Sequence, residues 1–396
     1  MKILVALSRF PWPLEKGDKL RAWYQIQGLA EHHEVHLVCL SDLAVTENDL
    51  KQVGFCKSVQ VIPLPKWRVG LNLLGGIFNR IPFQVNYFRS AAMRRVIRET
   101  IQREKIDACY VQLIRLGENL PHEFVNLRWV LDYMDTFSMG MSQRIETDRW
   151  WSRPVVKMET RRLRAYETRI AAHFDELTII SKRDAEGLAP LHQESVHVIP
   201  NGVSESFFEE MPRPSELEWD IIFFGNMGYL PNVQSARFLV EEVLPILHAR
   251  GLRPKLCIAG ARPAPIIQSW ASPEITVTGF VADIREFVVK SKISVAPLLG
   301  GQGMQNKLLE SMAMSLPTIT SGFSNEGVRA VPGEHLVVCN TALEFADAIQ
   351  DLLAHPEKAA HLAQNGRKFV EQHFRWSRMN AMLEAVITGQ ADAKKS

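Results

Sequence analysis

The sequence predicts an α/β fold made of two Rossmann-like, doubly wound domains that face each other across a cleft. Short apolar runs rich in β-branched residues alternate with amphipathic stretches, this alternation occurs twice, and a proline-containing acidic segment separates the two series. At 396 residues and 46% hydrophobic content, the chain is too long for one compact core and has a suitable length for two domains.

The first series of expected strands runs through the N-terminal half of the chain. Amphipathic stretches at residues 20–32 and 91–104 predict helices between strands. Such an alternation is typical of a parallel sheet that helices cover on both faces. The strands are expected at KILVAL, EVHLVCL, SVQVIPL, ACYVQL, RWVLDYM and ELTIIS.

The second series follows the segment VHVIPNGVSESFFEEMPRPSELEWD, which separates a last N-terminal strand from a first C-terminal one. Its strands are expected at WDIIFFG, KLCIAG, ITVTGF, ISVAPL, PTITS and HLVVC, with helices at 236–250 and 307–314. We therefore expect an N-terminal domain at 1–205, a C-terminal domain at 206–375, and a C-terminal helix and tail at 376–396.

The composition disfavours several classes of protein. A net charge of +2 gives no general attraction to nucleic acid, so no nucleic-acid partner is expected. The five cysteines are far apart and form no CxxC pair; we expect no metal site and a reducing, cytoplasmic compartment. The N-terminal apolar run is too short for a signal peptide, and no apolar segment reaches the roughly 18 residues of a membrane-spanning helix.

The strongest chemical signal is the stretch GGQGMQNKLLESMAMSLPTITSG, which directly follows an expected strand. Gly300, Gly301 and Gly303 let a phosphate approach the backbone, and the helix after them offers free N–H groups and the positive end of its dipole. That dipole disfavours a cation in the first turn, so Lys307 is expected to have a functional role, as a charge that balances a diphosphate. Glu310, on the same helical face, can accept two hydrogen bonds from a ribose diol.

This strand, glycine turn and helix resemble the donor-site signature of the GT-B glycosyltransferases of family 4, the glycosyl transferases group 1, in which a glutamate binds the nucleotide ribose. The resemblance extends to HVIPNGVSESFF, FFGNMGYLPNVQSARFLVEEVLP and RFPWPLEKGDKLRAWYQIQGLAEHHEVHLV, so it covers nearly the whole chain. The opening PWPLEKGDKLR and the segment GNMGYLPN together are most similar to the sugar transferases found with exosortase and exopolysaccharide systems. The resemblance implies a GT-B fold and a nucleotide-diphosphate sugar, UDP- or GDP-linked, as donor substrate, with no separate cofactor.

The sequence departs from the family pattern at two places. Family members usually carry a glutamate close to the transferred sugar where this chain has Gln302. They also carry a basic pair after the first strand of the C-terminal half, where GNMGYLPN offers Asn226; Lys307 is expected to supply the missing charge. The donor-binding residues that the resemblance implies are Gly17, Asn226, Gly301, Gly303, Met304, Asn306, Lys307 and Glu310.

The N-terminal half is expected to hold the acceptor. PLEKGDKLR lies between the first strand and the first helix, where family members place a glycine loop that faces the donor phosphate. Gly17 occupies that place, and Asp18 and Arg21 are expected on the acceptor side.

Two aspartates follow a central strand in WVLDYMDTFSM, where family members often carry a histidine or an acidic group beside the reacting sugar. Asp135 is the expected catalytic residue there, with an electrostatic role; a helix cap or turn residue is the alternative. Asp132 is more simply explained as structural. Lys307 and Gln302 complete the expected catalytic set, which would stabilise charge on the departing diphosphate and on an oxocarbenium-like sugar.

The resemblance implies a retaining glycosyltransferase for surface polysaccharide or lipid-linked saccharide synthesis. A nucleotide-sugar epimerase has the same fold, but its sites rely on acids and histidines that the C-terminal motifs lack. A non-catalytic nucleotide-sugar-binding regulatory protein is favoured by the missing glutamate. A dehydrogenase is disfavoured because neither half has GxGxxG after its first strand.

Residues 50–98 indicate a membrane contact, because they carry nine Lys or Arg residues and no acid, interleaved with aromatic residues around LNLLGGIF. A segment of this kind can lie on an anionic membrane surface and collect a lipid-linked acceptor; a solvated helix surface is the alternative. The stretch RWWSRPVVKMETRRLRAYE is similar but better balanced by acids. We expect a cytoplasmic protein that is peripheral at the inner face of the membrane.

Overall fold

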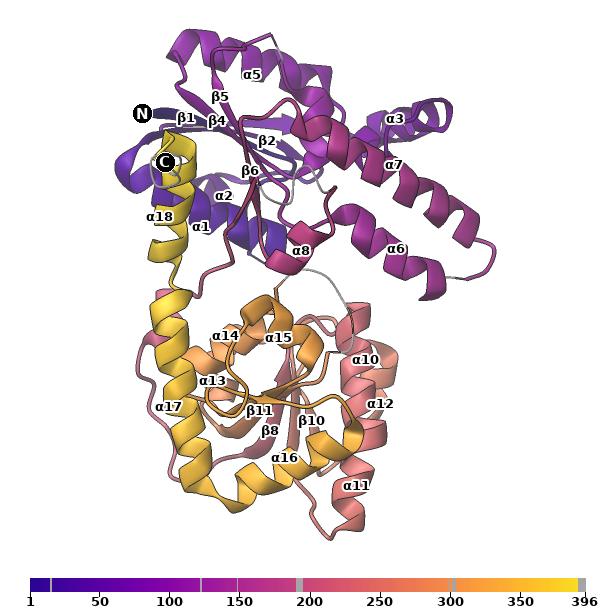
Figure 1. The fold of residues 1–396 in the computed structure, drawn as a ribbon, viewed down its shortest axis with the longest axis vertical. Helices are drawn as coiled ribbons and strands as arrows, with labels where there is room; N and C mark the ends of the chain where they lie inside the picture. Colours follow the sequence, from indigo (N-terminus) through magenta and orange to yellow (C-terminus); the bar gives the residue numbers. More distant parts are fainter. Residues whose placement is uncertain are drawn as a thin grey trace. The chain divides into compact units, whose positions relative to one another are not determined.

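The computed structural model describes residues 1–14, 16–121, 123–147, 149–189, 195–298, 300 and 304–390. The chain forms two compact units, whose elements are labelled in Figure 1. Unit 1 consists of Met1–Asn201 with Trp376–Ser396, and unit 2 consists of Gly202–Arg375. The predicted α/β class, with two parallel sheets, is confirmed.

The described part of unit 1 contains one seven-stranded sheet in the order β3-β2-β1-β4-β5-β6-β7, and all of its strand pairs are parallel. β1 lies inside the sheet, with Ile3 opposite both Val35 of β2 and Ala108 of the central strand β4. The strands are β1 (Lys2–Leu7), β2 (Glu34–Ser41), β3 (Ser58–Pro63), β4 (Ala108–Gln112), β5 (Arg128–Asp132), β6 (Glu176–Ile179) and β7 (Val196–Val198).

Helices cover both faces of this sheet, which explains why its central strands are apolar at nearly all of their inner positions. Alternate residues of β1 enter different cores: Leu4 packs with Ile97 of α5, and Ile3 packs with Ile26 of α1. The helical segments are α1 (Gly17–His32), α2 (Glu47–Lys51), α3 (Lys66–Phe78), α4 (Phe83–Tyr87), α5 (Ala91–Glu104), the 3-10 helix η1 (Ile114–Asn119), α6 (Phe137–Thr147), α7 (Arg153–Ala171), α8 (Lys182–Glu186) and α18 (Trp376–Thr388).

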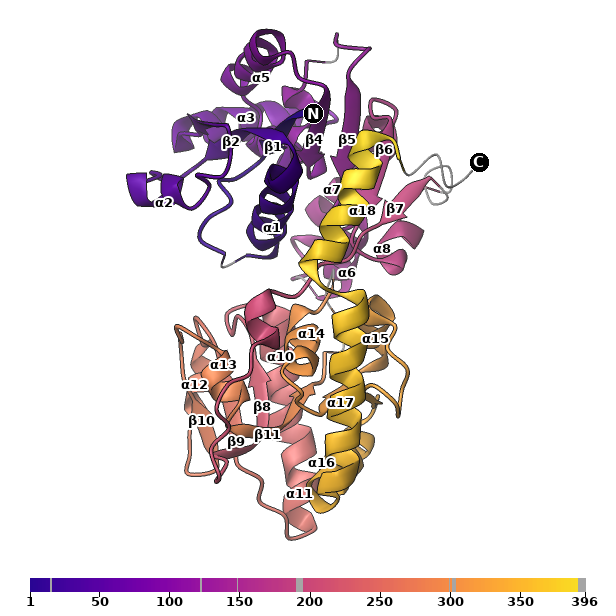
Figure 2. The ribbon, with the colours of Figure 1, turned by 90° about the vertical axis from the view of Figure 1, so that its left-hand side faces the viewer.

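The C-terminal helix α18 belongs to unit 1, although nearly the whole of unit 2 precedes it in the sequence. Both ribbon views place α18 alongside α1 (Figures 1 and 2). The rings of Tyr24 and Trp376 stack with centroids 4.8 Å apart. Gly28 lets the two helices approach, since a Cβ atom there would lie 2.0 Å from Nδ2 of Asn380. The segment 376–396, which the sequence set apart as a helix and tail, thus supplies a helix to the N-terminal sheet.

The described part of unit 2 contains a six-stranded parallel sheet in the order β10-β9-β8-β11-β12-β13. Its strands are β8 (Trp219–Phe224), β9 (Leu256–Ala259), β10 (Ile275–Val277), β11 (Ser291–Ala296), β12 (Thr318–Thr320) and β13 (Val337–Val338). Its helical segments are η2 (Glu205–Phe208), α10 (Leu230–Phe238), η3 (Leu239–Val243), α11 (Leu244–Ala249), α12 (Pro265–Ser269), α13 (Arg285–Val288), α14 (Asn306–Ala313), α15 (Gly322–Val328), α16 (Ala342–Ala354) and α17 (Pro356–His373).

The helix expected at 236–250 is interrupted by the π-helical segment η3. Pro245 follows directly, in the first turn of α11. Proline has no N–H to donate within a helix, so a widened turn before it relieves the missing hydrogen bond.

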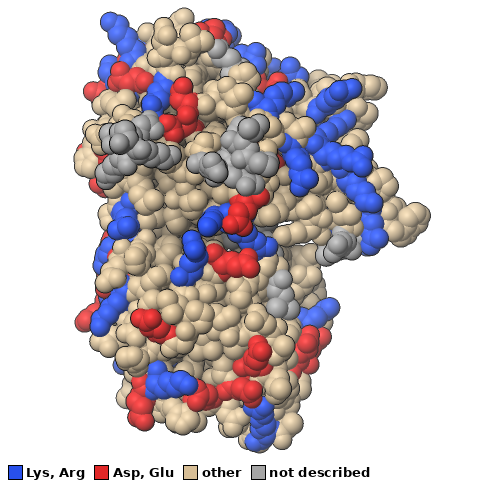
Figure 3. All heavy atoms as spheres, viewed as in Figure 1, with Lys and Arg blue, Asp and Glu red and all other residues tan. Residues whose placement is uncertain are grey.

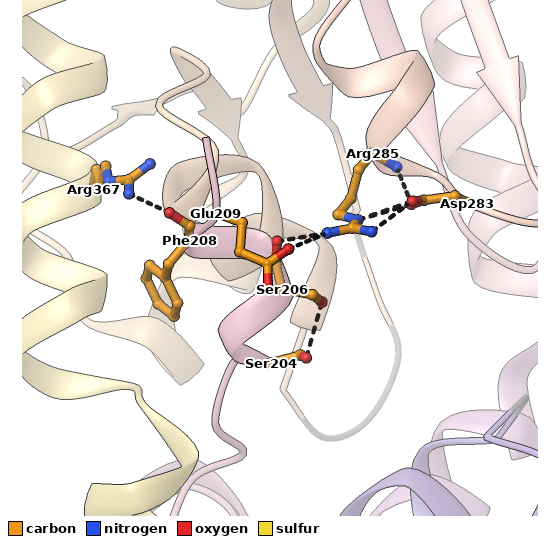
Figure 4. A network of polar contacts seen from close by, with 7 residues as sticks. All are labelled: Ser204, Ser206, Phe208, Glu209, Asp283, Arg285 and Arg367. Carbon is orange, nitrogen blue, oxygen red and sulfur yellow. Dashed lines mark hydrogen bonds and ion pairs between the residues drawn. The ribbon is translucent and has the colours of Figure 1, made fainter. Parts of the chain in front are cut away.

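Two arginines hold the first segment of unit 2 against its helices (Figure 4). Arg285 donates to the carbonyl of Ser206 at 2.8 Å and forms an ion pair with Asp283 at 2.7 Å. Arg367 of α17 donates to the carbonyl of Phe208 at 2.6 Å. These bonds tie η2 to two helices that lie far from it in the sequence.

No helix in the described part of the chain is both long and apolar enough to cross a membrane.

Candidate functional site

Two glycines whose backbones touch lie at neighbouring strand ends, Gly225 directly after β8 and Gly260 directly after β9. Gly225 and Gly260 have φ angles of +146° and +137°, and a Cβ atom on Gly260 would lie 1.7 Å from the carbonyl oxygen of Gly225. Gly225 also donates its N–H to the carbonyl of Ala259 at 3.0 Å. The ends of the adjacent strands β8 and β9 are therefore fixed at the edge where ligands bind in doubly wound folds.

Lys307 extends from the start of α14 to the loop after β8. Its Nζ donates to Oδ1 of Asn232 at 2.6 Å and lies 5.1 Å from the ring centroid of Phe223. A Cβ atom on Gly225 would lie 3.4 Å from the same Nζ. The ammonium thus lies beside the loop that lacks the basic pair of the family pattern.

Asn232 connects Lys307 to the rest of the loop through hydrogen bonds. Its Nδ2 donates to the carbonyl of Asn226 at 2.9 Å, and Oδ1 of Asn226 accepts from the N–H of Gly228 at 3.0 Å. Asn226 and Lys307 are therefore brought together through Asn232, which lies at the start of α10 and is buried. The chain of hydrogen bonds sets the position of the loop and the ammonium together.

Burial shifts the ionisation of both charged groups on α14. It lowers the pKa of Lys307 to about 7, and the nearby Glu310 carboxylate partly opposes that change. Burial also raises the pKa of Glu310 to about 7, with Lys307 opposing. Two groups whose pKa values are shifted toward neutral pH therefore lie on the helix that follows this strand end.

α14 is held in place by its apolar face and by bonds at both sides. Leu308, Leu309 and Met312 are buried, and the hydroxyl of Ser311 donates to Ser294 of β11 at 2.9 Å. Arg367 of α17 donates to the carbonyl of Ala313, at the last residue of the helix, at 3.0 Å. This anchoring fixes the direction in which the first turn of α14 presents its side chains.

Part of the predicted donor site lies outside the described residues, namely Gly301, Gln302 and Gly303. Met304 is described and is 8% exposed. Asn306 is the first residue of α14 and is half-buried.

In unit 1, the predicted acceptor-side residues lie at the N-terminus of α1. Gly17 is its first residue, and a Cβ atom there would lie 3.4 Å from Cε of Met134. Asp18 accepts from Nη1 of Arg9 at 2.8 Å, and its carbonyl accepts from Nε2 of Gln112 at 3.2 Å. The loop PLEKGDKLR is thus joined to the ends of β1 and β4.

The expectation that Arg21 faces the acceptor is wrong for this structure, because Arg21 is fully buried. Its Nε and Nη2 donate to Asp132 at 2.7 and 3.2 Å, and its Nη1 donates to Oδ1 of Asn201 at 3.1 Å. Asp132 also accepts from the hydroxyl of Tyr110 at 2.8 Å. Arg21 and Asp132 therefore form a buried structural ion pair. A structural role was expected from the sequence for Asp132 but not for Arg21.

Asp135 follows β5 and lies among the charged groups of unit 1. Burial raises the pKa of its carboxyl to about 7; the acids Asp184, Asp18 and Glu167 add to the rise, and Arg115 opposes it. Oδ1 of Asp135 is buried without a hydrogen bond to any described residue. A carboxyl in this state can exchange a proton near neutral pH or stabilise a nearby positive charge.

Two residues of this region have no role that the sequence indicates, since Arg9 only opens the segment RFPWP and Arg115 belongs to no motif. The fold brings both to Asp18, with Arg115 Nη1 at 3.8 Å from Oδ2.

Among the described residues, no cluster of His, Cys, Asp and Glu side chains is arranged so that it could hold a metal ion.

The two units, each a parallel sheet with helices, have the architecture of the GT-B fold. Residues 218–355 match the family model described as Glycosyl transferases group 1, and the resemblance to that family predicted from the sequence is confirmed. An uncharacterized 44.6 kDa protein in the cps region of Klebsiella pneumoniae is 21% identical over 215 residues, which are 52% of this chain and 54% of that protein. The chain therefore spans about half the length of that relative.

Several solved structures share the fold over nearly the whole chain. Sucrose-phosphate synthase from Thermosynechococcus elongatus is 15% identical with a TM-score of 0.70, covering 99% of this chain and 100% of that one. HepE of Anabaena in complex with UDP is 14% identical with a TM-score of 0.67, covering 98% and 100%. HepE in complex with UDP-glucose is 12% identical with a TM-score of 0.65, covering 98% and 100%. At these identities the likeness is one of fold.

Proposed function

We propose that this protein is a retaining glycosyltransferase that moves a sugar from a nucleoside-diphosphate sugar to a saccharide or lipid-linked acceptor. The observation that carries the proposal is the position of Lys307, whose Nζ lies 2.6 Å from Asn232 in the helix that follows the β8 loop. The family match of residues 218–355 and the relative from a cps region support a role in surface polysaccharide synthesis.

The proposed donor site assigns each group of unit 2 a role. The Lys307 ammonium and the N-terminal N–H groups of α14 would bind the diphosphate, and the Glu310 carboxylate would accept hydrogen bonds from the ribose. Asn226 would hold the loop against the phosphates. A UDP- or GDP-sugar is the expected donor, and complexes of HepE with UDP and UDP-glucose support a uridine nucleotide.

In the proposed reaction the bond between the anomeric carbon and the diphosphate breaks, and its electron pair leaves with the diphosphate. The acceptor oxygen forms the new bond on the same face, and its proton passes to the departing diphosphate. The protein contributes preorganised charge: Lys307 stabilises the diphosphate, and Asp135 is proposed to stabilise positive charge on the sugar. No covalent nucleophile is needed.

We further propose that unit 1 contacts an anionic membrane surface, first through α3. Trp67, Leu71, Leu74 and Phe78 on this helix are 68%, 61%, 59% and 91% exposed. Their spacing of three or four residues places them on one side of the helix. An apolar stripe that faces water is typical of an interaction surface.

The exposed face of α7 is basic because both acids of the helix are buried. Glu159 and Glu167 are 5% and 3% exposed, whereas Arg153, Lys157 and Arg161 are exposed. The sequence-based interpretation that acids balance this stretch is therefore wrong for its surface. Figure 3 shows Lys and Arg side chains gathered where Figure 1 places α7.

α3 and α7 adjoin, so their apolar and basic side chains form one surface. Nη1 of Arg162 in α7 donates to the carbonyl of Gly76 in α3 at 2.8 Å. Trp150 and Trp151, just before α7, are 79% and 61% exposed. Basic residues next to exposed tryptophans favour an anionic lipid surface over an acidic protein partner, because tryptophan lies well at the depth of lipid headgroups.

The proposed donor site can be tested by thermal-shift measurements with UDP, GDP, ADP and CMP and their common sugar conjugates. One diphosphate series should stabilise the protein, and Lys307→Ala should abolish the shift while the melting temperature without ligand stays similar. Lys290→Ala, which removes an exposed lysine of the same unit, is the matched control. Saturable binding without transfer or hydrolysis would instead favour a non-catalytic, regulatory nucleotide-sugar-binding protein. Gln302 in place of the usual glutamate is the feature of the sequence that supports this alternative. An absence of any shift would overturn the donor site.

A further inference from the structure

A cavity of ≈ 380 Å³ lies in unit 1 between two arginines and the helices α3 and α4. Arg9 follows β1, and Arg115 lies in η1 after β4. Because β1 and β4 are adjacent parallel strands, both arginines stand at the carboxyl edge of the sheet, where doubly wound folds bind ligands. The rest of the wall is formed by Leu73, Phe83, Gln84, Tyr87 and Phe88.

Among the described residues, Asp18 is the carboxylate that forms ion pairs with both guanidinium groups. Its Oδ2 lies 2.8 Å from Nη1 of Arg9 and 3.8 Å from Nη1 of Arg115. Nε of Arg115 is buried without a hydrogen bond to any described residue. Burial and then the neighbouring charge of Arg9 lower the pKa of Arg115 to about 10, and the charges of Asp18 and Asp135 oppose this change.

Phe88 orders both guanidinium groups at the cavity. The Cζ atoms of Arg9 and Arg115 lie 5.6 and 5.4 Å from the centroid of its ring. Arg115 also lies 4.8 Å from the centroid of Phe137. A guanidinium stacked over an aromatic ring directs its N–H groups outward in its own plane, the geometry that suits a phosphate. Nη1 of Arg9 already donates to Asp18, and Nη2 of Arg115 donates to Oε1 of Gln84 at 3.4 Å, so a phosphate would bind the remaining N–H groups.

The other walls fit an apolar chain rather than a sugar ring. A bound sugar needs several hydrogen-bonding partners for its hydroxyl groups, and apart from the arginines the lining residues offer two polar groups, the Gln84 amide and the Tyr87 hydroxyl. Leu73 is half-buried and lies on α3 between the exposed Leu71 and Leu74. One side of the cavity is therefore continuous with the apolar stripe of α3.

We propose that this cavity binds the phosphate or diphosphate group of an amphiphilic acceptor, with Arg9 and Arg115 on the anion and the apolar chain along Leu73. The proposal rests on the proposed function, since it names the acceptor class of the same reaction. It also gives Arg9 and Arg115 a binding role, which was not expected of either residue from the sequence. Asp18 would then position the two arginines rather than contact the acceptor sugar.

The test is isothermal titration of the full chain with farnesyl diphosphate, inorganic pyrophosphate and farnesol. The titrations use a Lys307→Ala background, so that the donor site in unit 2 cannot hold the anion. Arg9→Gln and Arg115→Gln are compared with Arg103→Gln, which removes an exposed arginine of α5 in the same unit. Arg9 is partly exposed, so its variant keeps the test valid if the Arg115 variant folds poorly.

We expect farnesyl diphosphate to bind most tightly and each site variant to weaken it by at least about tenfold, as the loss of a charge-assisted hydrogen bond implies. Arg103→Gln should leave binding unchanged. Equal binding by the site variants and the control, or no saturable binding, would overturn the proposal. Pyrophosphate binding as tightly as farnesyl diphosphate would overturn the assignment of the apolar walls. UDP binding is measured separately, with proteins that keep Lys307. A protein that fails to bind UDP tests the donor site, and one that fails to bind farnesyl diphosphate tests this cavity, so the two failures are distinguishable.

Discussion

Arg21 and Asp132 form an ion pair inside unit 1, with Nε of Arg21 2.7 Å from Oδ2 of Asp132 and neither side chain exposed. Burial alone would raise the pKa of Asp132, but the Arg21 guanidinium and the Tyr110 hydroxyl outweigh it and hold the pKa below its usual range. The pair joins α1 to β5, and Arg21 also bonds Asn201 at the end of unit 1's first segment. It therefore connects parts of unit 1 that are distant in the sequence.

Removing one member of this pair should leave a charge buried without its partner. We expect Asp132→Asn and Arg21→Met each to lower the free energy of unfolding by about 3–5 kcal/mol. The double variant Arg21→Met/Asp132→Asn should lose less than the sum of the two. Denaturant unfolding followed by tryptophan fluorescence measures this, and additive losses would contradict the view that the two residues act as a unit.

The strands could be predicted from the sequence because parallel strands buried on both faces leave an unbroken apolar run. KILVAL and WDIIFFG show this plainly, and β1 and β8 begin and end within those runs. Lys307 was also accessible to sequence reasoning, because a cation at a helix N-terminus opposes the helix dipole and needs another explanation.

Other features could not be predicted because they depend on contacts between distant segments. Nothing local in GDKLR distinguishes an arginine that faces solvent from one that pairs with Asp132, which is 111 residues away. The same holds for Arg9 and Arg115, and for the burial of Glu159 in a stretch that reads as evenly charged. The position of α18 beside α1 depends on Gly28 and Asn380, which carry no periodic signal.

Donor binding should depend on pH through Lys307. Burial lowers the pKa of this lysine to about 7, so it loses its proton as the pH rises through that value. Because a diphosphate needs the charged form, the affinity for UDP-glucose should fall from about pH 7 to about pH 9, approaching tenfold per unit. The dissociation constant across that range measures it. Lys307→Arg should remove the dependence, and a constant affinity in the unaltered protein would contradict the assignment.

The same residue should make the stability of unit 2 pH-dependent in the opposite direction. The folded pKa of Lys307, about 7, lies below its ordinary value of 10.5, so the unfolded chain binds more protons between these values. Stability without ligand should therefore rise with pH across this window through this group. Lys307→Met should flatten the rise, which thermal unfolding at several pH values would measure.

Asp135 is expected to lower stability at alkaline pH while serving the reaction. Its pKa is raised by burial from 3.8 to about 7, so the folded state holds a proton that the unfolded state has lost between these values, and stability falls as the pH rises through them. Asp135→Asn should raise the melting temperature near pH 8 relative to the unaltered protein and make little difference near pH 4. It should also reduce sugar transfer without weakening UDP binding. Unchanged transfer would remove Asp135 from the catalytic set.

Gly260 should be intolerant of any side chain. Its φ of +137° strains other residues, and a Cβ atom would lie 1.7 Å from the carbonyl oxygen of Gly225. We expect Gly260→Ala to cost roughly 2 kcal/mol or more and to displace the loop that faces Lys307. Gly251→Ala is the matched control, since Gly251 also has a positive φ, +80°, but nothing lies near its missing Cβ. A larger loss of UDP affinity in the control than in Gly260→Ala would contradict this account.

The proposed membrane surface separates two sets of basic residues that the sequence treats alike. Arg153, Lys157 and Arg161 lie exposed on α7, next to the tryptophans at 150 and 151, whereas Arg95, Arg98 and Arg103 lie on α5. Replacing the three α7 residues by glutamate should abolish sedimentation with vesicles that contain anionic lipid, because each adds repulsion where there was attraction.

The matched control reverses three charges on α5, at Arg95, Arg98 and Arg103, and should reduce sedimentation much less. The apolar part is tested by Leu71→Ser/Leu74→Ser on α3, which should weaken binding even at low salt, where charge attraction is strongest. If the two triple variants lose vesicle binding equally, a general attraction between the positive charges of unit 1 and anionic lipid explains the binding, and the assignment of the surface to α3 and α7 is wrong. If the α3 variant binds normally, the helix does not enter the headgroup layer, and the exposed stripe must serve another partner.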